Sequence, residues 1–230
     1  MRRLAVAAVC FALALPGTAR AADAPALKGE KERLGYSIGM DIGATLKRQG
    51  VEVDAESLAK GMKDAFTGGK TLLTEDEARV EIEGYQKKMM EKQAEEMKKL
   101  GEKNKAEGER FLAENAKKEG VQTLPSGLQY KVIAPGTGKT PKASDSVTTH
   151  YKGTLIDGTE FDSSYRRGQP ATFPVSGVIP GWTEALQLMK EGAKWQIFLP
   201  PSLAYGERGV GRDIGPNSTL IFEVELISVQ

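Results

Sequence analysis

Three stretches of this 230-residue sequence carry residue types that could do chemistry. PGTGKT, at residues 135–140, ends in the Gly-Lys-Thr of a phosphate-binding loop, and GVGRDIG, at residues 209–215, has glycines spaced somewhat like those of a dinucleotide-binding loop. His150 is the only histidine and could act as a general base beside a serine nucleophile. These residues suggest nucleotide binding or hydrolysis, and the elements around them decide between such interpretations.

The elements around the two glycine-rich stretches do not fit nucleotide binding. In PGTGKT the first glycine of the phosphate-loop pattern would fall at Ile133, and Pro141 follows where the motif requires a helix. GVGRDIG precedes a strand pattern, whereas a dinucleotide loop follows a strand and opens a helix. We therefore predict a hairpin turn at PGTGKT, a flap-like loop at GVGRDIG, and no bound nucleotide.

The single histidine and the single cysteine offer little to catalysis or metal binding. His150 stands in a strand pattern, where a cross-strand contact is its expected role. Cys10 lies in an N-terminal segment that we expect to be removed. A mature chain with one histidine and no cysteine has no His-Cys catalytic pair and no Cys/His zinc site. Any enzymatic activity would therefore use no nucleophile, metal or cofactor.

Residues 1–21 have the layout of a secretory signal. Arg2 and Arg3 precede an apolar run at residues 4–15 that is too short for a membrane span of about 20 residues, and a small-residue cleavage site follows at 19–21. Cleavage would leave 29 basic and 31 acidic residues, without the clustered basic footprint of a nucleic-acid-binding protein. We expect export to the periplasm, with outer-membrane association or secretion left open.

Residues 22–73 predict two helices that cannot cover their own apolar faces. The first has apolar residues at every fourth position beside a parallel row of glycines (Leu34, Ile38, Ile42 and Leu46; Gly35, Gly39 and Gly43). Asp54 predicts the N-cap of the second helix, and Gly68 its end. Each interior glycine costs about 1 kcal/mol relative to alanine, so we expect another helix to approach closely. The simplest partner is a second copy, in a homodimer formed through residues 27–90.

Residues 74–119 predict one long connecting helix. Thr74 and Glu77 form a capping-box pattern at its start. Only the first third has an apolar stripe, and residues 91–110 are charged on nearly all sides. No apolar seam of three or four heptads supports a coiled coil. This pattern is typical of a solvated spacer between domains.

Residues 120–230 change to strand patterns separated by turns. Asp157-Gly158 predicts a hairpin turn, and residues 181–189 give the only helical pattern, with Pro180 placed to begin it. Antiparallel strands around one short helix predict an α+β fold for this domain, preceded by the all-α region and the long helix.

Several segments of this domain resemble the FK506-binding-protein family of peptidyl-prolyl isomerases. They read GTEFDSSYRRGQPATFPV, VIPGWTEALQLMKEGAKWQIFLPPSLAYGERG and GPNSTLIFEVELISV. Upstream, YSIGMDIG, KGMKDAF and the long helix resemble the exported, dimeric branch of that family, the macrophage infectivity potentiator type. The resemblance spans nearly the whole mature chain and implies the FKBP fold.

The resemblance also implies an aromatic proline pocket, although such side chains in isolation most often form plain core. Its catalytic residues would be Asp162, Tyr205 and Ile179. Its substrate-binding residues would be Tyr151, Phe161, Arg167, Phe173, Val178, Trp182, Ile214 and Phe222. Ala171, Val210 and Asp213 depart from residues usual in the family, so the rim is less conventional than the floor.

Two functional hypotheses follow. The first is a cis/trans isomerase acting on X-Pro bonds of exported polypeptides, with FK506- or rapamycin-type macrolides as expected inhibitors. The second is a dimeric holdase chaperone in which the pocket mainly docks clients. The two are compatible, and a client without cis-proline would separate them, because only a holdase assists its refolding. A purely structural or adhesive role is the least favoured.

Overall fold

The computed structural model describes residues 27–230, so the predicted signal segment lies outside the described residues. The chain divides into two compact units, one ending at Thr74 and one running from Glu75 to Gln230. Among the described residues, no helix combines the length and apolar character that a membrane span requires.

The first unit consists of two helices, α1 (Glu30–Arg48) and α2 (Ala55–Thr67). The Asp54 side chain accepts a hydrogen bond of 2.8 Å from the Ser57 N–H, so the predicted N-cap is confirmed. Gly68 ends α2 in the left-handed region at φ 68°, where glycine is favoured. Neither helix contains a buried residue.

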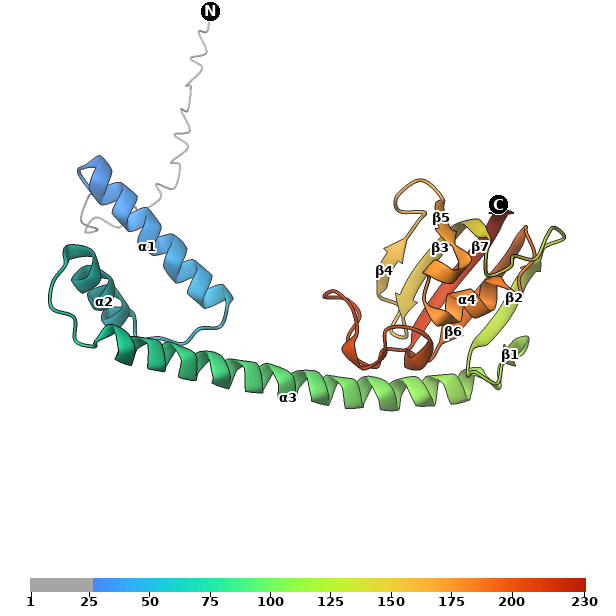
Figure 1. The fold of residues 1–230 in the computed structure, drawn as a ribbon, viewed down its shortest axis with the longest axis horizontal. Coiled ribbons are helices and arrows are strands. Elements are labelled where there is room, and N and C mark those ends of the chain that lie inside the picture. Colours follow the sequence, from blue (N-terminus) through green and yellow to red (C-terminus); the bar gives the residue numbers. More distant parts are fainter. Residues whose placement is uncertain (1–26) are drawn as a thin grey trace, which may run out of the picture. The chain divides into compact units, whose positions relative to one another are not determined.

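The second unit opens with α3 (Glu75–Asn115), 41 residues long (Figure 1). Its first turn carries three consecutive acidic residues, which suit the positive end of the helix dipole. The spacer interpretation predicts solvent around its later turns, yet Gly101, Gly108 and Asn115 are buried. The last part of α3 therefore packs against the rest of the second unit, with Gly101 and Gly108 facing Pro216 and Thr219.

The sheet has seven antiparallel strands in the order β1-β2-β6-β7-β3-β4, with β5 also paired to β3. The strands are β1 (Val121–Thr123), β2 (Gln129–Pro135), β3 (Ser146–Leu155), β4 (Glu160–Ser163), β5 (Ala171–Pro174), β6 (Ala193–Leu199) and β7 (Leu220–Val229). The one α-helix after α3 is α4 (Pro180–Leu186), which lies across the sheet (Figure 1). The predicted α+β fold class is confirmed.

The core lies between α4 and the sheet. Leu186 of α4 and Leu199 of β6 are both essentially inaccessible to solvent. A Cβ atom at Gly181 would come within 2.5 Å of the Leu199 side chain, so glycine is what allows α4 to lie this close to β6. Alternate residues of β6 and β7 point into this core, as the strand patterns predict.

PGTGKT is an irregular connection with a bend at Gly138, and the hairpin prediction is wrong, because β2 and β3 on either side of it are not neighbours in the sheet. The N–H groups of Thr137 and Gly138 both donate to the carbonyl of Glu191, at 3.2 and 3.0 Å. These bonds hold the connection against the segment before β6 instead of against β3. The predicted turn at Asp157-Gly158 does join paired strands, β3 and β4.

Candidate active site

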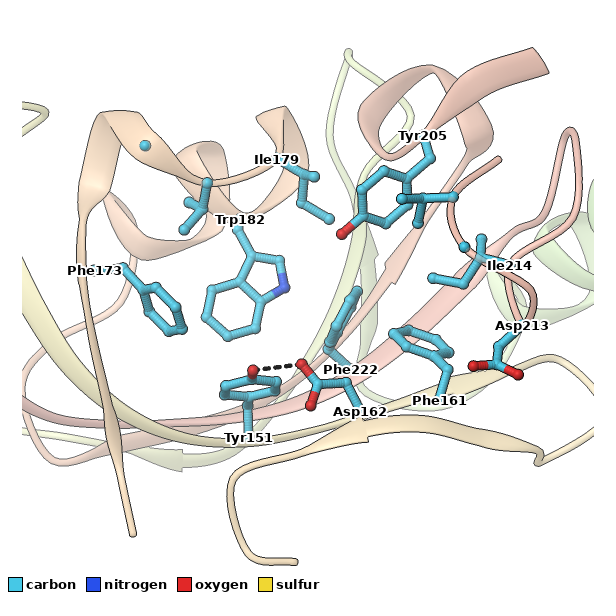
Figure 2. A pocket seen from close by; sticks show the side chains of 14 residues that line it. Tyr151, Phe161, Asp162, Phe173, Ile179, Trp182, Tyr205, Asp213, Ile214 and Phe222 are labelled. Carbon is cyan, nitrogen blue, oxygen red and sulfur yellow. Dashed lines mark hydrogen bonds between the residues drawn. The ribbon is translucent and has the colours of Figure 1, made fainter. Parts of the chain in front are cut away.

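A pocket of about 720 Å³ opens between the sheet, α4 and the loop before β7. This is a size typical of ligand-binding sites. Its lining is mostly aromatic and aliphatic (Figure 2). The lining residues are Tyr151, Phe161, Asp162, Phe173, Gly177, Val178, Ile179, Trp182, Tyr205, Val210, Gly211, Asp213, Ile214 and Phe222.

Trp182 lies at the centre of the aromatic cluster and is only 4% exposed. Its ring meets Tyr151, Phe173 and Phe222 edge to face, with centroid distances of 5.2, 6.1 and 5.4 Å. Aromatic quadrupoles favour such perpendicular contacts. The helix start fixes its backbone, because the Trp182 N–H donates to the Ile179 carbonyl at 2.9 Å. The indole is thus held rigidly as part of the pocket wall.

Gly153 in β3 allows the two phenylalanines of the pocket to meet. It pairs with Phe222 of β7 across the sheet. A Cβ atom here would lie 2.6 Å from the Phe161 ring and 2.8 Å from the Phe222 ring. With glycine in place, the two rings pack perpendicularly at 5.5 Å.

The polar side of the pocket is a closed hydrogen-bonded group. The Tyr151 hydroxyl donates to Asp162 Oδ2 at 2.6 Å, and Arg167 donates to the same hydroxyl at 2.7 Å while pairing with the Asp162 carboxylate. Burial alone would raise the pKa of Asp162, but the bonds from Tyr151 and Arg167 outweigh it and lower the pKa. Burial, then the bond to Asp162, raises the pKa of Tyr151. At neutral pH neither group is poised to exchange a proton.

Three donors at the pocket lack acceptors among residues 27–230. They are the N–H of Ile179, the hydroxyl of Tyr205 and the buried indole N–H of Trp182. Burial, and then the charge of Asp162, raises the pKa of Tyr205, so its hydroxyl keeps its proton at neutral pH. A bound molecule that supplies acceptors would satisfy these groups.

The structure brings together every predicted site residue at the pocket lining except Arg167, which binds Tyr151 and Asp162 but does not line the pocket itself. Four lining residues stand outside the predicted catalytic and substrate-binding set: Gly177, Val210, Gly211 and Asp213. Val210 and Asp213 are expected at the rim, and Gly211 lies between them in GVGRDIG, so the predicted flap-like loop could have indicated it. His150 is elsewhere, stacked on Tyr165 at 4.6 Å and hydrogen-bonded to Ser164 at 2.9 Å.

Comparison with known proteins matches both units. Residues 137–227 match the family described as FKBP-type peptidyl-prolyl cis-trans isomerase, and residues 31–132 match the domain amino terminal to it.

Named relatives match over nearly the full chain. The chain is 50% identical to "Outer membrane protein MIP" of Legionella longbeachae over 100% of its own length and 99% of that protein. It is 45% identical to "Peptidyl-prolyl cis-trans isomerase Mip" of Coxiella burnetii, with the same coverage. The crystal structure of FkpA from Escherichia coli superposes with a TM-score of 0.73 at 39% identity, covering 89% of this chain and 99% of FkpA.

Proposed function

The chain belongs to the FKBP-type peptidyl-prolyl cis-trans isomerase family and is such an isomerase, and we propose that the pocket at Trp182 is its active site. The observation that carries this proposal is the combination of a rigid aromatic floor with unpaired donors at Ile179 and Tyr205. Its substrates are proline-containing polypeptides, whose proline ring would rest on the indole.

The apolar floor favours the transition state of prolyl rotation. Rotation about a peptide bond meets a barrier of about 18–20 kcal/mol because amide resonance is lost in the twisted form. The twisted amide has less charge separation than the planar one, so an aromatic pocket solvates it better than it solvates the planar amide. Only this difference between ground and transition state accelerates the reaction.

The donors at the rim hold the substrate in place. The Ile179 N–H and the Tyr205 hydroxyl would donate to carbonyls that flank the proline, which fixes the chain in a turn and favours rotation of the prolyl bond. The Tyr151–Asp162–Arg167 group is internally compensated, so it shapes the polar wall and transfers no proton. Nucleophilic attack, metal and cofactor have no place in this mechanism.

The two tryptophans of the chain allow a matched test. Trp182 lines the pocket, whereas Trp195 is similarly buried but stacks on Tyr130 at 4.4 Å, outside the lining. Each change to alanine removes a buried indole and costs about 3–5 kcal/mol of stability. Cis/trans exchange of an X-Pro peptide is measured below the melting temperature of each variant, with and without an FK506-type macrolide.

We expect Trp182→Ala to lower kcat/KM more than tenfold and to lose macrolide inhibition, because the indole forms the floor on which the proline ring would rest. A tenfold loss corresponds to about 1.36 kcal/mol of transition-state stabilisation. Trp195→Ala should keep both. Equal losses in the two variants would mean that the pocket is not the site of catalysis.

We also infer a homodimer, formed through residues 27–90, in an exported protein. Large apolar side chains on α1 and α2 stay exposed, including Leu34 at 59% and Phe66 at 93%. A second copy would cover them. The pattern of residues 1–21 supports export, with the periplasm as destination. The Legionella relative is named an outer membrane protein, which favours an envelope location.

A further inference from the structure

Loop 206–219 forms the outer rim of the pocket, and its Ile214 is buried in the core cluster that includes Phe222 of β7. It contributes Val210, Asp213 and Ile214 to the lining. Its tip is closed on itself, because Val210 and Ile214 exchange backbone hydrogen bonds of 2.8 and 3.3 Å. Its base is closed by a bond of 2.8 Å from the Asn217 N–H to the Gly206 carbonyl. These bonds set the shape of the loop but not its position over the pocket.

Helix α3 supplies contacts that fix this position. The Asn104 side chain donates to the Pro216 carbonyl at 2.8 Å and reaches the Ser218 hydroxyl at 3.5 Å. In return, the Asn217 side chain donates to the carbonyl of Gly101 at 3.3 Å. Asn217 has φ 55° and is the only non-glycine residue with positive φ in the described part of the chain. A side-chain bond to α3 thus accompanies an uncommon backbone conformation at the base of the loop.

The surfaces of α3 and the loop pack closely, and at Gly108 an added methyl group would clash. A Cβ atom at Gly108 would collide with the Thr219 hydroxyl, and one at Gly101 would lie 3.3 Å from the Pro216 ring. A Cβ atom at Gly215 would lie 3.2 Å from both Leu100 and Asn104. Glycine in a helix interior lowers helix stability, and at Gly101 and Gly108 it allows the loop to pack closely against α3.

A second, separate contact attaches the end of α3 to the sheet. Asn115 donates to the Gln129 side chain at 2.9 Å, and Gln129 donates back to the Leu112 carbonyl at 2.9 Å. Phe111 packs on Phe198 of β6 at 6.0 Å. This attachment involves no residue of loop 206–219, so the two contacts can be broken independently.

We propose that Asn104 is a positioning residue for the isomerase, which holds the rim loop at the height that substrate and macrolide binding require. The inference rests on the proposed active site. It makes the stretch of α3 from Gly101 to Gly108 part of the binding apparatus as well as a connection. Disturbing Asn104 would let the loop, with Ile214 and Asp213, shift as a unit, which weakens binding while the floor at Trp182 stays intact.

The test compares two asparagine-to-aspartate changes in the full mature chain. Asn104→Asp keeps the size of the side chain but replaces the amide nitrogen that donates to the Pro216 carbonyl with a carboxylate oxygen, which repels that carbonyl. Asn115→Asp makes the same change against the Gln129 side chain. KM, kcat and the macrolide Kd are measured for both, together with the backbone amide resonances of residues 209–215.

We expect Asn104→Asp to raise KM and the macrolide Kd about fivefold, to leave kcat within about twofold, and to shift the resonances of residues 209–215. Asn115→Asp should lower the melting temperature but leave KM and these resonances near wild type. Gly108→Ala, which pushes on Thr219 without adding charge, should act like Asn104→Asp.

Unchanged KM in Asn104→Asp, or equal changes in Asn104→Asp and Asn115→Asp, would overturn the proposal. Either result would leave the active site itself standing, because that depends on the wild-type rate and on the Trp182→Ala comparison. Loss of activity in Trp195→Ala equal to that in Trp182→Ala would instead remove the premise.

Discussion

The two units of the chain differ in how completely each one buries its apolar side chains. The helices of residues 27–74 bury no residue at all, and Ile38 remains 50% exposed. The C-terminal sheet buries a continuous cluster around α4, with Leu186 and Leu199 almost fully covered. Burial is the main source of folding free energy. The second unit therefore covers its own apolar residues, whereas those of the first are left for the proposed homodimer to cover.

This difference separates where assembly and catalysis can reside. Every residue that lines the pocket belongs to the second unit, and the exposed apolar stripe of α1 belongs to the first. Changes confined to one unit should therefore alter one property and spare the other. Pairs of similar residues, one in each unit or one at the pocket and one away from it, can test this separation.

The largest effect is expected from a charge on the α1 stripe. Burying an isoleucine contributes about 1.5–3 kcal/mol, and Ile38→Asp would remove this on both protomers and bury a carboxylate. We expect the dimer to dissociate at least a hundredfold more readily, as measured by light scattering after gel filtration. Peptide isomerisation should stay near wild type.

Ile133 offers the matched control, because it is 51% exposed and lies on β2 in the second unit. Ile133→Asp should leave the mass in solution unchanged. A dimer that withstands Ile38→Asp would place the partner surface somewhere other than on α1.

A smaller effect is expected at the polar wall of the pocket. Tyr151→Phe removes the hydroxyl that joins Arg167 to Asp162, and we expect kcat/KM to fall about fivefold. Tyr165→Phe is the control, since that hydroxyl also binds a carboxylate, Glu225 at 3.1 Å, but away from the pocket. Similar kinetics for the two variants would argue that the wall takes no part in positioning the substrate.

Much of this fold and pocket could be predicted because the signals are local. Asp54 and Gly68 mark the ends of α2 by their own side-chain and backbone preferences. The aromatic residues of the pocket lie in family-specific segments that are recognisable without coordinates. The same resemblance gives Arg167 as the partner of Asp162, and the two do pair, but Arg167 does not itself line the pocket, since a matching segment does not say which side chains reach the cavity.

The features that the sequence does not disclose depend on distant partners. Residues 91–110 of α3 are charged on nearly all sides, so nothing local indicates that Gly101 and Gly108 face a loop more than 100 residues later. The failed hairpin at PGTGKT has the same origin. Glycine and proline predict a reversal of the chain, but bonds to the Glu191 carbonyl hold this segment against the residues before β6.

The pH profile sharpens the comparison further, because the pocket holds no group expected to titrate near neutrality. The pKa of Asp162 is lowered, and those of Tyr151 and Tyr205 are raised. We expect kcat/KM of the wild type to vary less than about twofold between roughly pH 5 and 9. A bell-shaped profile within this range would contradict a mechanism without proton transfer.

The smallest effects are expected from a pair of exposed aspartates, one in each unit. Asp54 caps α2, and Asp157 accepts a 2.9 Å bond from the Thr159 N–H in the β3–β4 turn. Backbone hydrogen bonds from Ser57 and Thr159, respectively, lower the pKa of each carboxylate. A lowered pKa means that each bond stabilises the folded state above the ordinary pKa of about 3.9 and loses this effect as the pH falls through the folded value.

At pH 7, calorimetry should therefore place the loss in a different unit for each variant. Asp54→Ala should lower the melting transition of the N-terminal unit by about 3 °C, and Asp157→Ala should do the same for the C-terminal unit. The difference from the wild type should shrink as the pH falls through the folded-state pKa of each carboxylate, because the charge-dependent part of each bond is lost on protonation. If both variants shifted one common transition instead, the two units would unfold together, and the separation of assembly from catalysis would hold for function but not for stability.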